Sequence, residues 1–212
     1  METTVVEAEC AIGYEERLRL LPYRLLARYL AAPPDGELLE LTRALEGDDT
    51  PFGRALTAFA AEAADSTPEA AGEEYHALFI GLGRSEILPY ASYYLTGFLQ
   101  ERPLARLRAD LERLGVARAE GCPEPEDHAA ALCEVMAGLI AGTFGDGRLA
   151  TQKQFFETHV ATWMGRLFAD LEEARSARLY RRLGTVGRRF LDIEGAAFAM
   201  VDGHEAAVPA GD

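Results

Sequence analysis

Residues 149–174 have the sequence LATQKQFFETHVATWMGRLFADLEEA, and this stretch decides the fold class. Its large apolar side chains recur at intervals of three and four residues, the spacing that places them on one face of an α-helix. The pattern predicts a single amphipathic helix over residues 149–174. The side chains that make up its apolar face are Phe155, Phe156, Val160, Trp163, Met164, Leu167, Phe168 and Leu171.

The same periodicity recurs along most of the chain, and no segment shows the sustained alternation of a strand. Ala and Leu are abundant while Val and Ile are scarce, which also favours helices over sheets. The sequence therefore predicts an all-α, single-domain bundle of about eight to ten helices over residues 1–200, followed by a flexible tail over 201–212. The other predicted helices span about 12–32, 35–45, 93–99, 103–114, 125–143 and 176–199. Two more begin at Thr50, with Phe52, Leu56 and Phe59 on the apolar face, and at Ser66, with Tyr75, Leu78 and Phe79.

Several helix starts carry local signals. Asp35 is placed to cap one helix, and Thr50 followed by Pro51 is placed to begin the next. Ser66 with Glu69 has the spacing of a capping box. Pro22 lies inside the first helix, which it should either kink or begin.

The charge balance limits the kinds of partner. The 212 residues include 35 Asp and Glu against 21 Lys and Arg, a net charge of −14. Duplex DNA and anionic membranes would be repelled by this excess, so a basic partner fits better. No window is long and apolar enough to span a membrane, and residues 1–10 lack the features of a secretory signal, so we expect a cytoplasmic protein with its three cysteines reduced.

A metal-dependent helical-bundle enzyme is the alternative from another class. Glu73 and His76 have the Glu-x-x-His spacing of one half of a di-metal site, and His128 and His159 would be the further ligands. Such a site needs the motif twice, but the later histidines have carboxylates one or two residues away, which a helix does not direct to the same ion. No nucleotide-binding or nucleophile motif is present, so the sequence predicts neither a catalytic centre nor a cofactor.

Two loops stand out against the helical pattern. The first, about residues 81–89, leads into Pro89-Tyr90-Ala91-Ser92-Tyr93-Tyr94, which is rich in tyrosine. The second, about residues 116–125, leads into Glu124-Pro125-Glu126-Asp127-His128. Helix capping explains the proline and the acids of the second loop, with Pro125 in the first turn, but not the histidine beside them.

These two loops, together with Glu74-Tyr75-His76-Ala77-Leu78-Phe79-Ile80-Gly81, resemble the TorD/DmsD/NarJ family of redox-enzyme maturation chaperones. Further similarity lies in residues 23–30 and in Phe155-Phe156-x-x-His159 with Trp163. The resemblance covers roughly residues 14–195. It implies a cytoplasmic chaperone that binds the N-terminal peptide of a molybdenum oxidoreductase subunit, either a twin-arginine signal peptide or a remnant of one, during cofactor insertion.

The resemblance also implies where the peptide binds. Such a peptide has a basic part and an apolar part, so its receptor needs both an acidic surface and an apolar groove. We expect Asp127 to hydrogen-bond to or pair with an arginine, and His128 to orient that arginine or to donate to backbone carbonyls. We expect the groove to lie between the two loops. The hinge-like loop near Gly81 leaves open a monomer or a domain-swapped homodimer. The predicted peptide-binding residues are Tyr75, Phe79, Pro89, Tyr90, Ser92, Tyr94, Glu124, Pro125, Asp127 and His128.

Overall fold

The computed structural model describes residues 13–81, 85–118 and 124–205, and within these ranges the chain forms ten α-helices, two short π-helical segments and no strand. The all-α prediction is confirmed. The α-helices are α2 (Tyr14–Ala31), α3 (Gly36–Arg43), α4 (Pro51–Ala64), α5 (Pro68–Tyr75), α6 (Ala91–Thr96), α7 (Arg102–Arg113), α8 (Ala129–Ile140), α9 (Leu149–Phe155), α10 (Met164–Glu173) and α11 (Leu179–Glu205). The π-helical segments η1 (His76–Ile80) and η2 (Phe156–Val160) directly follow α5 and α9.

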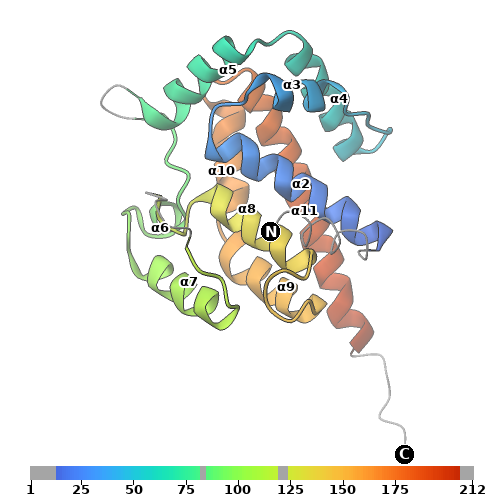
Figure 1. Cartoon of the computed structure of the whole chain (residues 1–212), viewed down its shortest axis with the longest axis vertical. Helices are drawn as coiled ribbons and strands as arrows, with labels where there is room; N and C mark the ends of the chain where they lie inside the picture. Colours follow the sequence, from blue (N-terminus) through green and yellow to red (C-terminus); the bar gives the residue numbers. More distant parts are fainter. Residues whose placement is uncertain (1–12, 82–84, 119–123, 206–212) are drawn as a thin grey trace, which may run out of the picture.

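The helices pack around two long-range pairings, α2 along α8 and α10 along α11 (Figure 1). The long helix α11 also contacts α2, α4 and α5. In Figure 1, α3, α4 and α5 lie at the top, and α6 and α7 lie at the lower left. The largest fully buried side chains come from helices throughout the chain, so one core joins them: Trp163, Tyr23, Tyr29, Tyr180, Phe59, Phe168 and Phe198.

Two of the predicted helix starts are confirmed and one is wrong. The Asp35 carboxylate accepts from Leu38 N at 2.8 Å, and Thr50 Oγ1 accepts from Gly53 N at 3.0 Å. The cap of α5 is Thr67 and not Ser66, whose hydroxyl instead donates to the Glu62 carbonyl at 2.8 Å. The helix α2 continues through Pro22 and begins earlier, at Tyr14, so this proline does not mark its start.

The stretch 149–174 is not one helix, because it is interrupted between η2 and α10. The indole of Trp163 is fully buried, and its Nε1 donates to the His159 carbonyl at 2.7 Å. In a continuous helix the backbone N–H of residue 163 would bond that carbonyl, but here it donates to the Val160 carbonyl at 3.3 Å. The predicted helix is therefore interrupted at residues 161–163, where the tryptophan side chain is buried in the core.

Two helix ends also differ from the prediction. The helix α8 begins at Ala129, four residues after Pro125, with His128 as its N-cap. The helix α11 runs to Glu205, five residues into the segment predicted as a tail. Residues 82–84, at the centre of the predicted hinge loop, lie outside the described residues, as do Cys10 and Cys122; Cys133 is a free thiol in the core.

A buried polar network ties the two ends of the chain together. Arg19 of α2 donates to both carboxylate oxygens of Glu194 on α11, at 2.7 and 2.9 Å, and to Gln152 on α9 at 2.9 Å. The hydroxyl of Tyr23 donates to the same Glu194 at 3.1 Å. Because Glu194 is fully buried, loss of one partner would leave an uncompensated charge in the core.

Candidate functional site

The two motif-bearing loops are joined directly by backbone hydrogen bonds. Ala91 N donates to the Asp127 carbonyl at 3.0 Å and Ala129 N donates to the Pro89 carbonyl at 2.8 Å, which makes an antiparallel bridge between Tyr90 and His128. The helices α6 and α8 both start from this bridge. The groove expected between the loops is therefore closed along these residues, and the open space lies on either side of the bridge.

Asp127 is an interior residue whose side chain caps a helix of another segment. It is 1% exposed, and its Oδ2 accepts from Ser92 N, in the first turn of α6, at 2.8 Å. Among the described residues, its Oδ1 has no hydrogen-bond partner. Asp127 lines a cavity of about 490 Å³ that also contacts Arg102, Arg106 and His159. An arginine arriving from solvent does not meet this carboxylate at the surface.

His128 faces the other side of the bridge. Its Nδ1 accepts from Ala130 N at 3.2 Å, which caps α8 and requires Nδ1 to be unprotonated. Burial lowers the pKa of His128, against the opposing effect of the Glu124 and Asp127 carboxylates, so the neutral ring is favoured. His128 lines a cavity of about 580 Å³ that does not include Asp127. Asp127 lies in a turn that is closed by a hydrogen bond from His128 N to the Pro125 carbonyl at 3.2 Å, and the two neighbouring side chains line different cavities.

An aromatic cluster lies beside His128. The Tyr90 ring meets the imidazole edge-on at 5.1 Å, and its hydroxyl donates to the Glu124 carboxylate. Burial and this carboxylate raise the pKa of Tyr90, and the same two causes raise the pKa of Tyr75. The Phe79 ring lies 5.0 Å from that of Tyr75. The structure thus brings these predicted residues together around Glu124.

Tyr94 does not belong to this cluster. Its ring packs 5.3 Å from that of Trp163, and its hydroxyl donates to Asp170 at 2.6 Å. Arg166 of α10 donates to the Tyr94 carbonyl at 2.8 Å. These contacts attach α6 to α10, so Tyr94 fixes the position of the bridge and does not line the cavity at His128.

The cavity at His128 combines an apolar wall with carboxylates. Leu111, Val116, Val135 and Phe144 supply the large apolar surfaces. The acidic residues at its edge are Glu124, Glu126 and Glu134, and Pro125 and Arg118 also line it. This combination of apolar and acidic surface matches a ligand that carries both apolar and basic groups.

Two of these carboxylates already have partners: Glu124 accepts from the Tyr90 hydroxyl, and Glu126 is held by an arginine. Arg108 of α7 donates to Glu126 through Nε at 3.1 Å and through Nη2 at 2.9 Å, a two-pronged ion pair that lowers the pKa of Glu126. By contrast, Glu134 makes no hydrogen bond or ion pair within the described part of the chain. Its side chain is exposed, but the partial desolvation at the cavity wall raises its pKa. The acidic groups at the cavity therefore differ in how readily they can accept a new cation.

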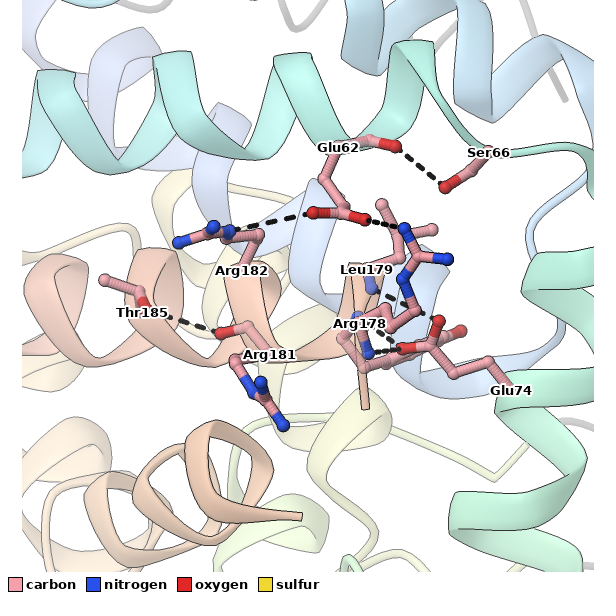
Figure 2. A network of polar contacts seen from close by, with 9 residues as sticks. Glu62, Ser66, Glu74, Arg178, Leu179, Arg181, Arg182 and Thr185 are labelled. Atoms are coloured by element: carbon pink, nitrogen blue, oxygen red, sulfur yellow. Dashed lines mark hydrogen bonds and ion pairs between the residues drawn. The ribbon is translucent and has the colours of Figure 1, made fainter. Parts of the chain in front are cut away.

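Sequence reasoning missed the role of Glu74, which holds the start of α11 (Figure 2). Its carboxylate accepts from the backbone N–H groups of Arg178 at 2.8 Å, Leu179 at 3.2 Å and Tyr180 at 2.7 Å. Figure 2 also shows Glu62 of α4 between Arg178 and Arg182, with which it forms ion pairs. No local signal could reveal this cap, because Glu74 and Arg178 are 104 residues apart.

The Asp110–His159 pair was missed for the same reason. His159 Nε2 lies 2.6 Å from Asp110 Oδ2, across 49 residues of sequence. Burial, with help from Arg106 and Arg113, lowers the pKa of His159 to about 4, so the neutral ring donates to the carboxylate at neutral pH. The pair joins α7 to η2.

The four residues of the metal-enzyme alternative are in separate environments. His76 is exposed and contacts the Gly72 carbonyl at 2.7 Å, while Glu73 is exposed on the same helix. His128 caps α8, and His159 pairs with Asp110. Within the described ranges, no three His, Cys, Asp or Glu residues are arranged to hold a metal ion. The geometry does not favour the alternative.

A search of the described helices finds none that is both long and apolar enough to cross a bilayer.

The arrangement of the helices defines the structural class. A crystal structure from Archaeoglobus fulgidus, described as a redox enzyme maturation protein, has the same fold: the TM-score is 0.54 at 21% identity, over 85% of this chain and 94% of that one. The family model of the nitrate reductase delta subunit matches residues 45–169, more than half of the chain and including all three motifs of the site. The chain belongs to this family, which confirms the resemblance to the TorD/DmsD/NarJ group.

Curated relatives agree with this membership. The chaperone protein TorD of Vibrio cholerae serotype O1 is 32% identical over 95 residues in its El Tor Inaba strain and 34% identical over 95 residues in its Classical Ogawa strain. Each match covers 41% of this chain and 43% of the relative, so the chain aligns with less than half the length of these proteins.

Proposed function

We propose that this protein is a cytoplasmic chaperone that binds the N-terminal peptide of a molybdenum oxidoreductase subunit, a twin-arginine signal peptide or a remnant of one, during cofactor insertion and assembly. The curated relatives are named as chaperones, and the structural neighbour is described as a maturation protein. The proposal assigns the chain a binding function and no catalytic one.

The cavity at His128 is the observation that carries the proposal. Its volume of about 580 Å³, its apolar wall and its three carboxylates complement a peptide in which an arginine pair adjoins apolar residues. The −14 charge of the chain adds a long-range attraction for such a peptide. In this proposal the arginines bind at Glu124 and Glu134, while Asp127 and His128 maintain the bridge that shapes the cavity.

Because Asp127 and His128 have a structural role in this proposal, they are poor positions for testing peptide binding by substitution. Replacing Asp127 or His128 by alanine removes a helix cap and therefore destabilises the fold as well as the site. Glu134 is better suited, because it is exposed, lines the cavity and has no partner to lose in the described structure. Glu73 provides the matched control, since it is an exposed glutamate without a described contact on α5.

The test is calorimetric titration with a peptide that contains an arginine pair and an apolar stretch, compared with a peptide in which glutamine replaces both arginines. We expect the arginine peptide to bind at least about tenfold more tightly, a difference of about 1.4 kcal/mol. Glu134→Gln should weaken its binding several-fold, whereas Glu73→Gln should not. Equal affinity for the two peptides, or no binding, would refute the proposal.

A further inference from the structure

A second cavity continues from the first along α8. It has a volume of about 460 Å³ and lies between α2 and α8, where Arg24, Ala27 and Arg28 face Ala137, Gly138 and Ala141. It shares two lining residues, Glu134 and Phe144, with the cavity at His128. The two cavities therefore lie end to end. We call them together the α8 trench, which follows α8 from Ala130 to Ala141, a length of about 17 Å at 1.5 Å per residue.

The trench exists because the helices are lined there by residues with small side chains, which leave space between them. On α8 its floor includes Ala130, Ala131, Ala137, Gly138 and Ala141, and on α2 its wall includes Ala27 and Ala31. Phe144 packs directly on Gly138, in the space that a Cβ at that position would need. The Phe144 ring is thereby fixed as a wall shared by both halves of the trench.

Charge is distributed unevenly along the trench. Glu124 and Glu126 lie at the end near His128, and Glu134 lies at the junction of the two halves. Arg24 and Arg28 line the far end, where Arg28 also pairs with Asp35 at 3.9 Å, whereas Arg118 is the only arginine among the described residues that line the near end. A peptide with a basic front and an apolar continuation is favoured in the direction that places its arginines near Glu124 and Glu134, since reversal would bring them next to Arg24 and Arg28.

We propose that the α8 trench holds the apolar stretch that follows the arginine pair of the bound peptide, with the arginines at Glu124 and Glu134 and the apolar residues running over Ala137 and Ala141 toward Arg24. This inference rests on the proposed function and adds the path and the direction of the peptide. Burial of apolar side chains in the half next to Arg24 supplies affinity, while the carboxylates set the direction.

The first experiment separates the two halves. A short peptide ends after the arginine pair, and a long peptide continues with about ten apolar residues. Ala141→Trp places an indole in the far half, and Ala64→Trp, at an exposed alanine of α4, is the control. We expect wild-type protein and the control to bind the long peptide at least about tenfold more tightly than the short one. Ala141→Trp should reduce the affinity for the long peptide to that for the short one and leave the latter unchanged.

A second experiment needs no variant. The long peptide carries a photoreactive benzophenone at the middle of its apolar stretch, and crosslinked residues are identified by mass spectrometry. We expect crosslinks to residues 24–31 and 137–144. A peptide of reversed sequence should bind wild-type protein at least about tenfold more weakly.

The outcomes distinguish the two proposals. If the long peptide binds wild-type protein no better than the short one, or binds folded Ala141→Trp undiminished, or crosslinks elsewhere, the trench assignment is overturned while the chaperone proposal stands. If neither peptide binds wild-type protein, both are overturned.

Discussion

Arg108 competes, at the scale of single side chains, with any arginine that the site would bind. Its guanidinium already occupies both oxygens of Glu126 at the edge of the cavity. The Arg108 side chain is 53% exposed and that of Glu126 is 17% exposed, so an arginine from solvent can replace Arg108 on this carboxylate only by taking over the same ion pair. In the free protein this intramolecular pair neutralises Glu126.

Arg108→Gln should therefore increase the affinity for an arginine-containing peptide. An exposed ion pair contributes up to about 1 kcal/mol, so we expect binding to tighten by about two- to fivefold in calorimetric titration. Arg189→Gln is the control, because it removes the same charge from a surface pair with Asp192 on α11. Unchanged or weaker binding by Arg108→Gln would show that Glu126 takes no part in peptide binding.

The sequence predicts that the two loops lie together, as the bridge between them shows, but not the direction of each side chain. Asp127 and His128 were expected to act on one arginine, yet they face separate cavities. The bridge that divides them joins Tyr90 and His128, which are 38 positions apart, and nothing in either loop alone indicates that they will pair. The unpaired Glu134 was missed because a glutamate on a predicted helix is usually solvated, and only the packing of α2 and Phe144 turns its surroundings into a cavity.

Local chemistry predicts an element well where its signals are local, and poorly where a distant side chain intervenes. The caps at Asp35 and Thr50 depend on residues three positions away, and both were found. The break after residue 160 depends on the burial of one indole by the rest of the core, which periodicity cannot show. The start of α11 likewise depends on Glu74, far away in the sequence.

Glu74 should accordingly control the stability of the element that it caps. Its carboxylate accepts three backbone N–H groups at the positive end of α11. We expect Glu74→Ala to lower the free energy of unfolding by about 1–3 kcal/mol, the range for helix caps and charged hydrogen bonds. Urea denaturation followed by circular dichroism measures the change.

Glu73→Ala is the matched control, because Glu73 is the adjacent, exposed glutamate of the same helix. It should change the stability by less than about 0.5 kcal/mol. Equal effects of the two substitutions would mean that the cap contributes nothing beyond the loss of one negative charge.

The acidic residues behind the net charge of −14 are not equivalent, because some are paired with arginines and others line the cavity at His128. Composition gave its sign and size but not its distribution. Several acids are held by arginines, including Glu62 by Arg178 and Glu172 by Arg188, so they contribute little to the field outside. The acids around the cavity at His128 lie closer to the proposed ligand than these pairs do. Raising the salt concentration therefore distinguishes the attraction by carboxylates at the cavity from the long-range attraction by the net charge of the protein.

Rising salt should weaken the binding of the arginine peptide and leave that of its glutamine counterpart nearly unchanged. Charges in solvent are screened over about 8 Å at physiological ionic strength and over about 3 Å at 1 M, so the long-range attraction is lost first. We expect the affinity of wild-type protein to fall several-fold between 50 mM and 500 mM NaCl, and that of Glu134→Gln to fall less steeply because one of the responsible charges is gone. If the two proteins respond equally, Glu134 is not in contact with the arginines, and the attraction comes from the charge of the whole molecule.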